Sequence, residues 1–388
     1  MPELPVLRGP GGRPLRVAHL TTVDMSLALL LGRELQADVE TGLETFALSA
    51  PGPFASDVEK TGATHVPVPG LTRSWQPRQD LRAARELVSV LKGLRLDVLH
   101  THNPKTGVIG RLAGRAAGVP VIVNTCHGLW AGPGDPWRRQ AMVLGAEALA
   151  AQASHAELYQ NAADRHRLRR FVSPRRSRVV GNGIDLERFR PDPAGQERVR
   201  AELGIGSAEL VVGAIGRRVQ EKGIAEFVAA ARALGERARF LWIGPEDPDK
   251  PDALAEEDPA VRWVPARSDM PGVYSALDVF VLPSYREGFS RSGMEAAACG
   301  LPMVLSDIRG CREVGDHERH LLLVPPRDAD ALTGAIARLL DDAALRARLG
   351  AAAGERARAE FDQVGIAAES LRTYAAVARR RGLGWAEQ

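Results

Sequence analysis

The stretch that decides the fold is DVFVLPSYREGFSRSGMEAAACG, residues 278–300. Its apolar run, Val279–Leu282, predicts a strand that is buried on both faces of a parallel sheet. Pro283 ends that strand, a polar loop follows, and a helix of small residues ends at Gly300. A strand, a loop and a helix N-terminus in this order favour anion binding, because free backbone N–H groups and the positive helix end converge there.

The same alternation of short apolar runs and amphipathic segments fills most of the chain. In the first half the predicted strands are Arg16–Leu20, Glu44–Leu48, His65–Val68, Asp97–His100, Pro120–Asn124, Ala156–Tyr159 and Arg178–Val180. In the second half they are Leu210–Ile215, Phe240–Ile243, Val261–Val264, Val279–Leu282, Pro302–Leu305 and Leu321–Val324. Predicted helices include Leu27–Gln36, Leu81–Leu94, Gly107–Ala117, Glu197–Leu203, Ala331–Leu340, Leu345–Arg358 and Val364–Arg381. This pattern predicts an α/β protein with two doubly wound parallel sheets, whose ligands bind at the carboxyl ends of the strands.

The predicted domain organisation follows from the breaks in that pattern. Residues 1–14 are rich in Pro and Gly and lack an apolar core, so we expect a flexible tail and no signal peptide. We expect a first domain over residues 15–193 and a second over residues 194–361, joined near the Asn182-Gly183 turn signal. Residues 362–388 are expected to form a helix that returns to the first domain.

Composition excludes several classes of protein. The chain has 388 residues, and its 51 basic and 48 acidic side chains nearly balance, which argues against a nucleic-acid partner. Its 3 cysteines are too scattered for a disulfide framework or a zinc site, which favours a reducing, cytoplasmic setting. No segment approaches the roughly 20 apolar residues of a membrane span, and no P-loop is present.

Two cations lie in the loop after the first strand of the second half, which reads GRRVQEKG over residues 216–223. The planar fork of Arg217 and the ammonium of Lys222 suit a diphosphate. The alternative is that either cation simply pairs with Glu221 at the surface.

These motifs together resemble family 4 of the retaining GT-B glycosyltransferases, of the exopolysaccharide and capsule type. The resemblance rests on Glu287 and Glu295 in the spacing E-x7-E, on GRRVQEKG, and on three motifs elsewhere in the chain. These are HTHNPKTG at 100–107, TCHG at 125–128 and GCRE at 310–313. It covers the chain from about Leu15 to Tyr374 and implies two Rossmann-like domains that face across a cleft.

The resemblance also implies roles for individual residues. His127, Arg217, Lys222 and Glu287 would form the catalytic group, with His127 contacting the donor sugar. Donor binding would use Gly216, Arg217, Lys222, Gly244, Val264, Arg267, Glu287, Gly288, Phe289, Ser290 and Glu295. Thr22, Asp24, His102 and Lys105 would lie on the acceptor side. The family often has a Gly-Gly loop where this chain has TTVDMS, so Asp24 has the alternative role of capping a helix.

Three further features each have two interpretations. Glu295 either binds the ribose of the nucleotide or closes a capping box with Ser292. Asp247 and Asp249 spell the D-x-D of metal-dependent transferases, but we interpret them as an acidic surface loop and expect neither a metal nor a cofactor. The nine arginines between Arg138 and Arg178 form either a solvated helix face or a surface for anionic lipid.

The resulting functional prediction is a retaining hexosyltransferase. It would move a sugar from a nucleotide-sugar, UDP-hexose or UDP-N-acetylhexosamine, to a glycan or polyprenyl-linked acceptor in surface polysaccharide assembly. We expect a cytoplasmic protein with peripheral contact to the inner face of an anionic membrane. The alternatives are a nucleotide-sugar epimerase, a transferase with a small-molecule acceptor, and a catalytically inactive binding subunit.

Overall fold

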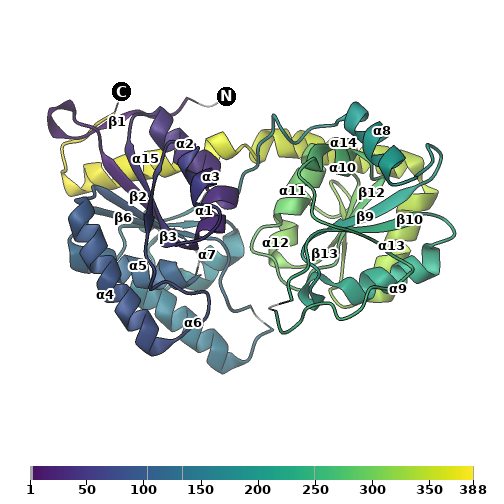
Figure 1. Cartoon of the computed structure of the whole chain (residues 1–388), viewed down its shortest axis with the longest axis horizontal. Helices are drawn as coiled ribbons and strands as arrows, with labels where there is room; N and C mark the ends of the chain where they lie inside the picture. The colour runs from purple at the N-terminus through teal and green to yellow at the C-terminus, as the bar shows by residue number, and fades with distance from the viewer. Residues whose placement is uncertain (1–2, 103, 133, 249, 388) are drawn as a thin grey trace. The chain divides into compact units, whose positions relative to one another are not determined.

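The structure is a computed structural model that describes residues 3–102, 104–132, 134–248 and 250–387. The chain forms two compact units (Figure 1). Unit 1 comprises Met1–Gly181 and Gln363–Gln388, and unit 2 comprises Asn182–Asp362. The division after Gly181 precedes the predicted boundary at residue 193. The reason is that Ile184 already donates its backbone N–H to Phe361 O, 2.9 Å away within unit 2.

Unit 1 contains a seven-stranded parallel sheet with the order β4-β3-β2-β5-β6-β7-β8. Its strands are β2 (Arg16–Val23), β3 (Glu44–Ala50), β4 (Thr64–Pro67), β5 (Val98–His102), β6 (Val121–Cys126), β7 (Ala156–Tyr159) and β8 (Ser177–Val179). Every strand predicted for the first half is confirmed, with its ends shifted by a few residues. Strand order reverses between β2 and β5, which makes the end of that strand pair the switch point of the sheet.

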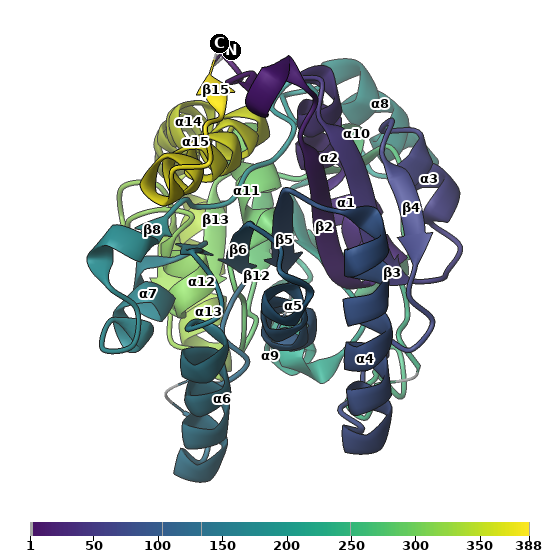
Figure 2. The same ribbon diagram turned by 90° about the vertical axis from the view of Figure 1, so that its left-hand side faces the viewer.

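The helices of unit 1 cover both faces of this sheet. They are α1 (Asp24–Leu30), α2 (Gly32–Glu40), α3 (Ala55–Glu59), α4 (Pro77–Leu94), α5 (Pro104–Ala117), α6 (Trp137–Ala150), α7 (Ala162–Leu168) and α15 (Gln363–Arg381), with short 3-10 turns at Pro10–Gly12 and Pro174–Arg176. Helices α4, α5 and α6 lie side by side, as Figure 2 shows. The helix predicted over Leu27–Gln36 is interrupted at Leu31, where α1 ends and α2 begins.

Alternating side chains of the strands supply two apolar cores. Leu20 and Leu99 face one core together with Leu87 of α4, whereas Val17 and Val98 face the other with Leu371 of α15. Because both faces are covered, the strands read as near-continuous apolar runs.

Within residues 1–14, Leu7 and Arg8 form a strand that the predicted flexible tail did not include. Strand β1 (Leu7–Arg8) pairs antiparallel with β15 (Ala386–Glu387) at the other end of the chain. Leu7 is buried, and Arg13 forms a two-bonded ion pair with Asp97, at 2.6 and 2.7 Å. A local composition argument missed this segment because its partners lie far away in sequence.

Unit 2 contains a six-stranded parallel sheet with the order β11-β10-β9-β12-β13-β14. Its strands are β9 (Val211–Ile215), β10 (Arg239–Ile243), β11 (Arg262–Val264), β12 (Val279–Leu282), β13 (Met303–Ser306) and β14 (Leu322–Val324). Its helices are α8 (Pro193–Glu202), α9 (Ile224–Leu234), α10 (Met270–Ser275), α11 (Arg291–Ala298), α12 (Arg309–Arg312), α13 (Ala329–Asp341) and α14 (Ala343–Glu360), with a 3-10 turn at Gln220–Lys222. The six predicted strands are confirmed, and the switch point lies between β9 and β12.

Within the described part of the chain, no helix is both long enough and apolar enough to cross a bilayer.

Candidate functional site

The switch point of unit 2 brings together the two loops that the sequence singles out. The loop 216–223 follows β9, and the loop 283–290 follows β12, its neighbour in the sheet. The Tyr285 backbone N–H donates to Glu221 O, 2.8 Å away, and so joins the two loops. In doubly wound sheets a ligand binds at such a place, because the loops diverge there and leave a crevice.

An ion pair closes this junction. Lys222 Nζ lies 2.6 Å from Glu287 Oε1, and the two side chains are only 17% and 14% exposed. Two residues predicted for the catalytic group are therefore in direct contact. The stem of Lys222 lies along Gly216, where an added Cβ would be 3.7 Å from Lys222 Cδ.

Arg217 has acidic partners of its own. It forms a short ion pair with Asp247, and its Nη2 lies 3.2 Å from Glu221 Oε1. The alternative predicted for this cation, pairing with Glu221, is thus observed, while Lys222 pairs elsewhere. Asp247 belongs to the D-x-D segment whose second member, Asp249, lies outside the described residues. At 38% exposure the Arg217 side chain remains open to exchange its carboxylates for another anion.

Gly216 and Gly244 pack backbone to backbone. A Cβ on Gly244 would lie 2.1 Å from Gly216 O, so only glycine fits. Gly216 N donates to Ile243 O, and Gly244 N donates to Val264 O, both at 3.0 Å. The Val264 side chain is buried in the core, so its contribution to this edge is its carbonyl group.

The GCRE segment, which was identified by resemblance alone, packs against the loop that contains Glu287. Gly310 O accepts a hydrogen bond from Ser290 N at 3.1 Å, and a Cβ on Gly310 would lie 2.6 Å from the Glu287 carbonyl. Phe289 packs edge-on against Phe361, with ring centroids 5.7 Å apart. This contact anchors the loop in the core. The Phe289 ring therefore has a structural role in this loop.

The capping box predicted as the alternative for Glu295 is not formed. Ser290 is the N-cap of α11, and its hydroxyl accepts from Gly293 N at 3.0 Å. Glu295 instead accepts from Tyr274 OH at 2.7 Å and from Arg291 Nε at 3.1 Å. Burial raises the pKa of Glu295 and, more strongly, that of Tyr274. Sequence reasoning missed Tyr274, since it lies on α10, 21 residues before Glu295.

Arg267 is held by carboxylates on its own side of the unit. It donates two hydrogen bonds to Asp269, at 2.8 and 2.7 Å, and one to Glu202 at 2.8 Å. Both carboxylates raise the pKa of its guanidinium. Arg267 is therefore already paired with acidic side chains, and its role in donor binding stays a prediction.

The corresponding edge of unit 1 holds the residues predicted for the acceptor side. Asp24 is the first residue of α1, and its carboxylate accepts from Met25 N at 2.8 Å and from Phe54 N at 2.6 Å. Asp24 thus accepts from one N–H of the first turn, although the N-cap of α1 is Val23. Thr22 is buried, with its hydroxyl 3.5 Å from that of Thr106.

Lys105 is buried at the start of α5. Its ammonium donates to Thr72 O and Thr72 Oγ1, both at 2.9 Å, and to Ser74 O at 2.7 Å. It also lies 2.5 Å from Asp80 and 5.7 Å from the Trp75 ring. All three ammonium protons are used inside the protein, so Lys105 orders the loop that carries Trp75.

His127 follows β6 and contacts His102, which ends β5. His127 Nε2 lies 3.0 Å from His102 Nδ1, and His127 Nδ1 lies 2.9 Å from the Gln160 amide nitrogen. Burial lowers the pKa of His127 to about 4, so its imidazole is neutral at physiological pH. Gln160 gave no signal in the sequence.

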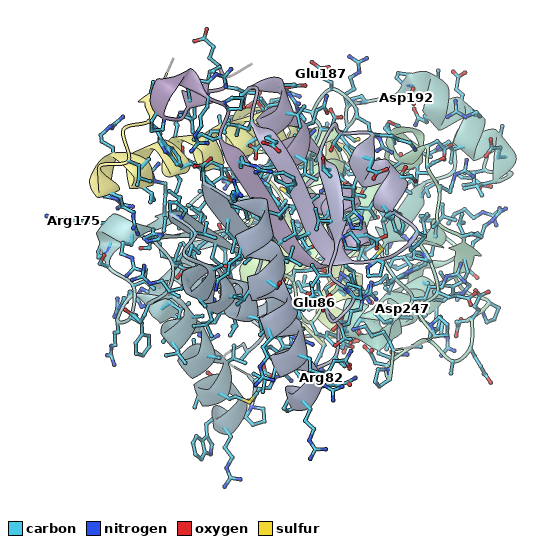
Figure 3. All side chains as sticks on the ribbon, turned by 60° about the vertical axis from the view of Figure 1, so that its left-hand side comes forward. Arg82, Glu86, Arg175, Glu187, Asp192 and Asp247 are labelled. Atoms are coloured by element: carbon cyan, nitrogen blue, oxygen red, sulfur yellow. The ribbon has the colours of Figure 1, made fainter. Side chains whose placement is uncertain are left out.

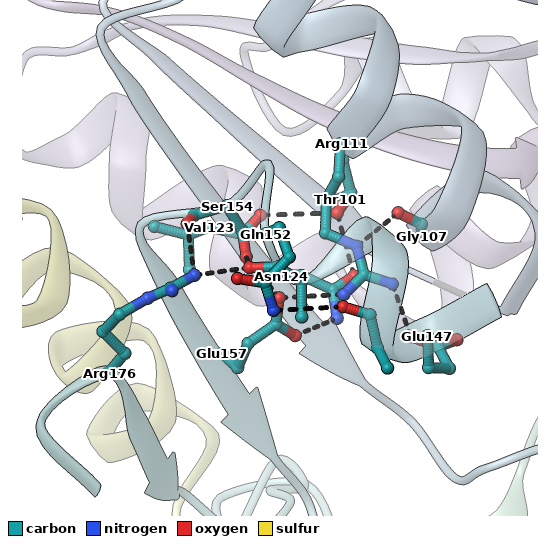
Figure 4. Close-up of polar contacts among 12 residues, drawn as sticks. Thr101, Gly107, Arg111, Val123, Asn124, Glu147, Gln152, Ser154, Glu157 and Arg176 are labelled. Atoms are coloured by element: carbon teal, nitrogen blue, oxygen red, sulfur yellow. Dashed lines mark hydrogen bonds and ion pairs between the residues drawn. The ribbon is translucent and has the colours of Figure 1, made fainter. Parts of the chain in front are cut away.

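A buried ionic network fixes the strand ends that present these histidines (Figure 4). Arg111 Nη1 lies 2.8 Å from Glu157 Oε1, and Arg111 also pairs with Glu147. Asn124 donates to Glu157 Oε2 at 2.8 Å and accepts from Thr101 at 2.9 Å. The network thereby links α5 to β5, β6 and β7, and losing Arg111 would leave buried carboxylates without their cation.

The arginines between Arg138 and Arg178 do not form the uniform solvated face that was one of their two interpretations. Arg176 donates to Ser154 O at 2.6 Å, Arg165 donates to Ser177 Oγ at 3.1 Å, and Arg167 donates to Gln140 at 3.0 Å. Several of these side chains therefore tie loops to the body of unit 1.

Comparison with known proteins agrees with this architecture. The model of the family described as "Glycosyltransferase Family 4" matches residues 28–188, and that of "Glycosyl transferases group 1" matches residues 209–342. A UDP-Gal:alpha-D-GlcNAc-diphosphoundecaprenol alpha-1,3-galactosyltransferase of Escherichia coli is 30% identical over 298 residues, which cover 72% of this chain and 75% of that protein. A D-inositol 3-phosphate glycosyltransferase of Salinispora arenicola is 31% identical over 356 residues, covering 82% of this chain and 79% of that protein.

Solved structures show the same fold at lower identity. A sucrose-phosphate synthase from Thermosynechococcus elongatus has a TM-score of 0.78 at 24% identity, and the match covers 94% of this chain and 100% of that one. HepE of Anabaena, solved with UDP and glucose, has a TM-score of 0.78 at 19% identity and 93% and 99% coverage.

The two Rossmann-like units are thus those of a GT-B protein, and the protein is an enzyme, a glycosyltransferase. The chain belongs to glycosyltransferase family 4.

Proposed function

We propose that this glycosyltransferase takes a hexose or N-acetylhexosamine from a UDP-sugar and transfers it, with retention of configuration, to a lipid-linked sugar. The observation that carries the proposal is the Lys222–Glu287 pair at the switch point of unit 2. The name of the E. coli relative supports both substrate classes, since it gives UDP-Gal as donor and a diphosphoundecaprenol-linked sugar as acceptor.

In this proposal the donor diphosphate exchanges with the carboxylates that now hold the two cations. Lys222 and Arg217 would bind phosphate oxygens, and Glu287 would be released toward the hydroxyl groups of the sugar. Ser290 caps Gly293 N, which leaves the N–H groups of Arg291 and Ser292 for a phosphate at the tip of α11. These groups stabilise the negative charge that grows as the glycosidic bond breaks, and losing one such donor typically costs about 10² to 10³ in rate.

Retention would follow from displacement on the front face of the sugar. The leaving diphosphate would accept the proton of the acceptor hydroxyl, and Glu287 would orient the sugar without forming a covalent bond to it. His127 would contact the donor sugar, and Glu295 would hold the ribose. Neither a metal nor a cofactor takes part in this scheme.

A thermal-shift screen of UDP, GDP, ADP and TDP tests the donor assignment. A ligand at 100 times its Kd stabilises a protein by about 2.7 kcal/mol, which is a readily measured shift. We expect UDP to give the largest shift and Lys222→Met to remove most of it. If no nucleotide shifts the transition, or if Lys222→Met leaves the UDP shift intact, the proposed donor site is wrong.

An exposed surface on unit 1 favours a lipid-linked acceptor. We call it the Trp/Arg patch, and it consists of Trp75, Arg78, Leu81, Arg82, Trp130, Trp137, Arg138 and Met142, all exposed or partly exposed. The Trp75 and Trp130 rings stack with centroids 6.2 Å apart, which joins the start of α4 to the loop before α6. The two helices extend in the same direction, and Arg82 projects outward from α4 (Figures 2 and 3).

Such a patch has the chemistry of a membrane-surface contact. Trp rings favour the interfacial zone of a bilayer, and each Arg near an anionic surface contributes about 1 kcal/mol. Trp137 and Met142 are 73% and 64% exposed, well above what a buried face would allow. A membrane contact here would bring the acceptor end of unit 1 to its lipid-linked substrate.

Vesicle sedimentation tests this contact. The protein should pellet with phosphatidylglycerol-containing vesicles, remain in solution with pure phosphatidylcholine, and be released at high salt. The double variant Trp137→Ser/Met142→Ser should lose most of the binding. Phe171→Ser is the matched control, because Phe171 is also exposed, at 48%, but lies outside the patch. Equal sedimentation with both vesicles, or with neither, would contradict a charge-dependent contact.

A small-molecule acceptor is the second candidate, and the inositol-phosphate relative favours it. Assays with UDP-sugars separate the candidates. Transfer to a lipid-linked acceptor alone supports the first, and transfer to a soluble sugar phosphate supports the second. Conversion of the UDP-sugar without any acceptor would indicate an epimerase.

A further inference from the structure

A line of buried polar side chains runs through unit 1 from α2 to His127. We call it the histidine chain, and its members are Asp38, His19, His102, His127 and Gln160. The distances are 2.9 Å from Asp38 Oδ2 to His19 Nε2, 3.0 Å from His19 Nδ1 to His102 Nε2, 3.0 Å from His102 Nδ1 to His127 Nε2, and 2.9 Å from His127 Nδ1 to Gln160 Nε2. Asp38, His19, His102 and Gln160 are all buried.

Counting protons shows that this chain is complete in its neutral form. Its four contacts need four hydrogens. Three neutral imidazoles supply one each, and the amide of Gln160 supplies the fourth, whereas the Asp38 carboxylate can only accept. Every contact then has one donor and one acceptor.

The two ends also set the direction of the chain. Because Asp38 only accepts, neutral His19 donates from Nε2, which leaves its Nδ1 as an acceptor. His102 must then donate from Nε2 to His19, and His127 must donate from Nε2 to His102. The amide nitrogen of Gln160 faces His127 Nδ1, which agrees with a bare nitrogen at that position.

The neighbouring groups do not compete for these nitrogens. His100 lies beside His102, with ring centroids 4.2 Å apart, but its nitrogens contact Tyr374 OH and Thr125 Oγ1, both at 2.7 Å. Glu34 accepts from Ser370 at 2.5 Å and lies 3.6 Å from His100, and burial raises the pKa of its carboxyl group.

His19, His100 and His102 are close enough to offer one nitrogen each to a metal ion. However, each of their six ring nitrogens already has a protein partner. A metal ion would have to break the contact between His19 and His102, so the hydrogen-bonded chain accounts for the cluster better than a metal site does.

We propose that, when His19 is neutral, Asp38, His19, His102 and Gln160 are positioning residues that keep the proton of His127 on Nε2 and leave Nδ1 bare. A sugar hydroxyl that takes the place of the Gln160 amide then donates to His127 and cannot accept from it. This consequence rests on the proposed contact of His127 with the donor sugar. The proton arrangement itself rests only on the geometry of unit 1.

Nitrogen-15 NMR of the histidine rings in the ligand-free protein tests the arrangement directly, because protonated and bare ring nitrogens have well-separated shifts. The spectrum is recorded on the alkaline side of the His19 titration, which the same experiment locates. We expect His19, His102 and His127 all to be protonated at Nε2. A protonated Nδ1 on His127, or averaged shifts for its two nitrogens, would overturn the proposal whatever the donor is.

Two substitutions at Gln160 sharpen the test. Gln160→Glu puts an acceptor at both ends, so four contacts would share three ring protons, and the chain should take up one more proton. Gln160→Met removes the donor without adding an acceptor, so Nε2 of His127 should keep its proton. We expect the His127 Nδ1 signal to change to the protonated type in Gln160→Glu only. Identical ring spectra in the two variants would contradict the proposal.

Kinetics then connect the arrangement to transfer. Because a protonated Nδ1 cannot accept from a sugar hydroxyl, Gln160→Glu should lower kcat/KM for the donor about tenfold more than Gln160→Met does, the equivalent of one hydrogen bond. His102→Phe should allow the His127 proton to move between Nε2 and Nδ1. His100→Phe, a change at an equally buried neighbour outside the histidine chain, should leave that proton on Nε2. If NMR confirms the arrangement but donor kinetics do not respond, the proposed role of His127 fails and the histidine chain stands.

Discussion

Lys222 Nζ lies 2.6 Å from Glu287 Oε1, so the two loops at the switch point of unit 2 are joined by a cation and a carboxylate that are both largely buried. Neither charge is free before a ligand arrives. Binding an anion therefore means exchanging one partner of Lys222 for another, and the released carboxylate becomes available to the rest of the ligand.

Lys222→Met should lower kcat/KM by about 10² to 10³, because it removes a group that stabilises the leaving diphosphate. It also leaves Glu287 without its cation, so some loss of stability should accompany the loss of rate. Steady-state kinetics and urea denaturation measure the two effects. Lys60→Met is the control, since Lys60 forms an exposed ion pair with Asp57. A Lys222→Met enzyme as active as the Lys60→Met enzyme would exclude the proposed role.

Glu295→Gln should raise the donor KM while the melting temperature stays nearly constant. The reason is that Glu295 lies in the second turn of α11, where it accepts hydrogen bonds from Tyr274 and Arg291 and takes no part in the helix cap. Ser290→Ala should lower the free energy of unfolding by about 1 kcal/mol, because Ser290 is the residue that caps α11. A drop in stability for Glu295→Gln with an unchanged donor KM would remove the ribose assignment.

Local sequence patterns predicted the features of the fold that depend on residues close together in the sequence. Short apolar runs predicted each strand of the two parallel sheets, and the loop positions of Lys222 and Glu287 followed because parallel strands end at one edge of a sheet. Partners far apart in sequence gave no such signal. The pairing of Leu7–Arg8 with Ala386–Glu387 is one example.

The interior of unit 1 was equally hidden. Asp38 and Gln160 stand in ordinary helix and loop sequence, and only the folded sheet places them at the two ends of a line of histidines. The resemblance places Lys105 on the acceptor side, but it gave no sign that the ammonium donates to the loop at Thr72 and Ser74. Motifs locate the edge of a sheet more reliably than they assign the partner of each side chain.

Stability should fall as the pH drops from about 6.5 toward 4. Burial lowers the pKa of His127 to about 4, and it lowers those of His100 and His102 well below their ordinary value. In this window the unfolded chain binds protons that the folded protein does not bind. Each such group lowers the free energy of unfolding by about 1.4 kcal/mol for each pH unit of acidification. His19 behaves oppositely: burial lowers its pKa, but Asp38 outweighs burial and raises it, so its stabilisation is present below about 6.5 and is lost at higher pH.

Urea midpoints measured across the acid range check this expectation. In His127→Gln the free energy of unfolding should depend less steeply on pH, by about 1.4 kcal/mol per pH unit, because one titrating group is gone. Midpoints that stay flat on acidification would mean that these imidazoles are charged, or solvated, in the folded protein.

Gly223→Ala should damage the donor site through the backbone alone. Gly223 has a φ of 77°, which favours glycine, and an added Cβ would lie 2.1 Å from Pro283 O. Since Lys222 precedes Gly223 and Pro283 begins the loop of Glu287, relief of this clash must separate the two loops. We expect a raised donor KM in addition to a conformational cost of about 1 to 2 kcal/mol. Gly300→Ala is a matched control in the same unit, with a φ of 76° and no atom within 4 Å of the new Cβ, so it should show the conformational cost alone. The two loops are not coupled as described if both variants lose equal stability and bind the donor equally well.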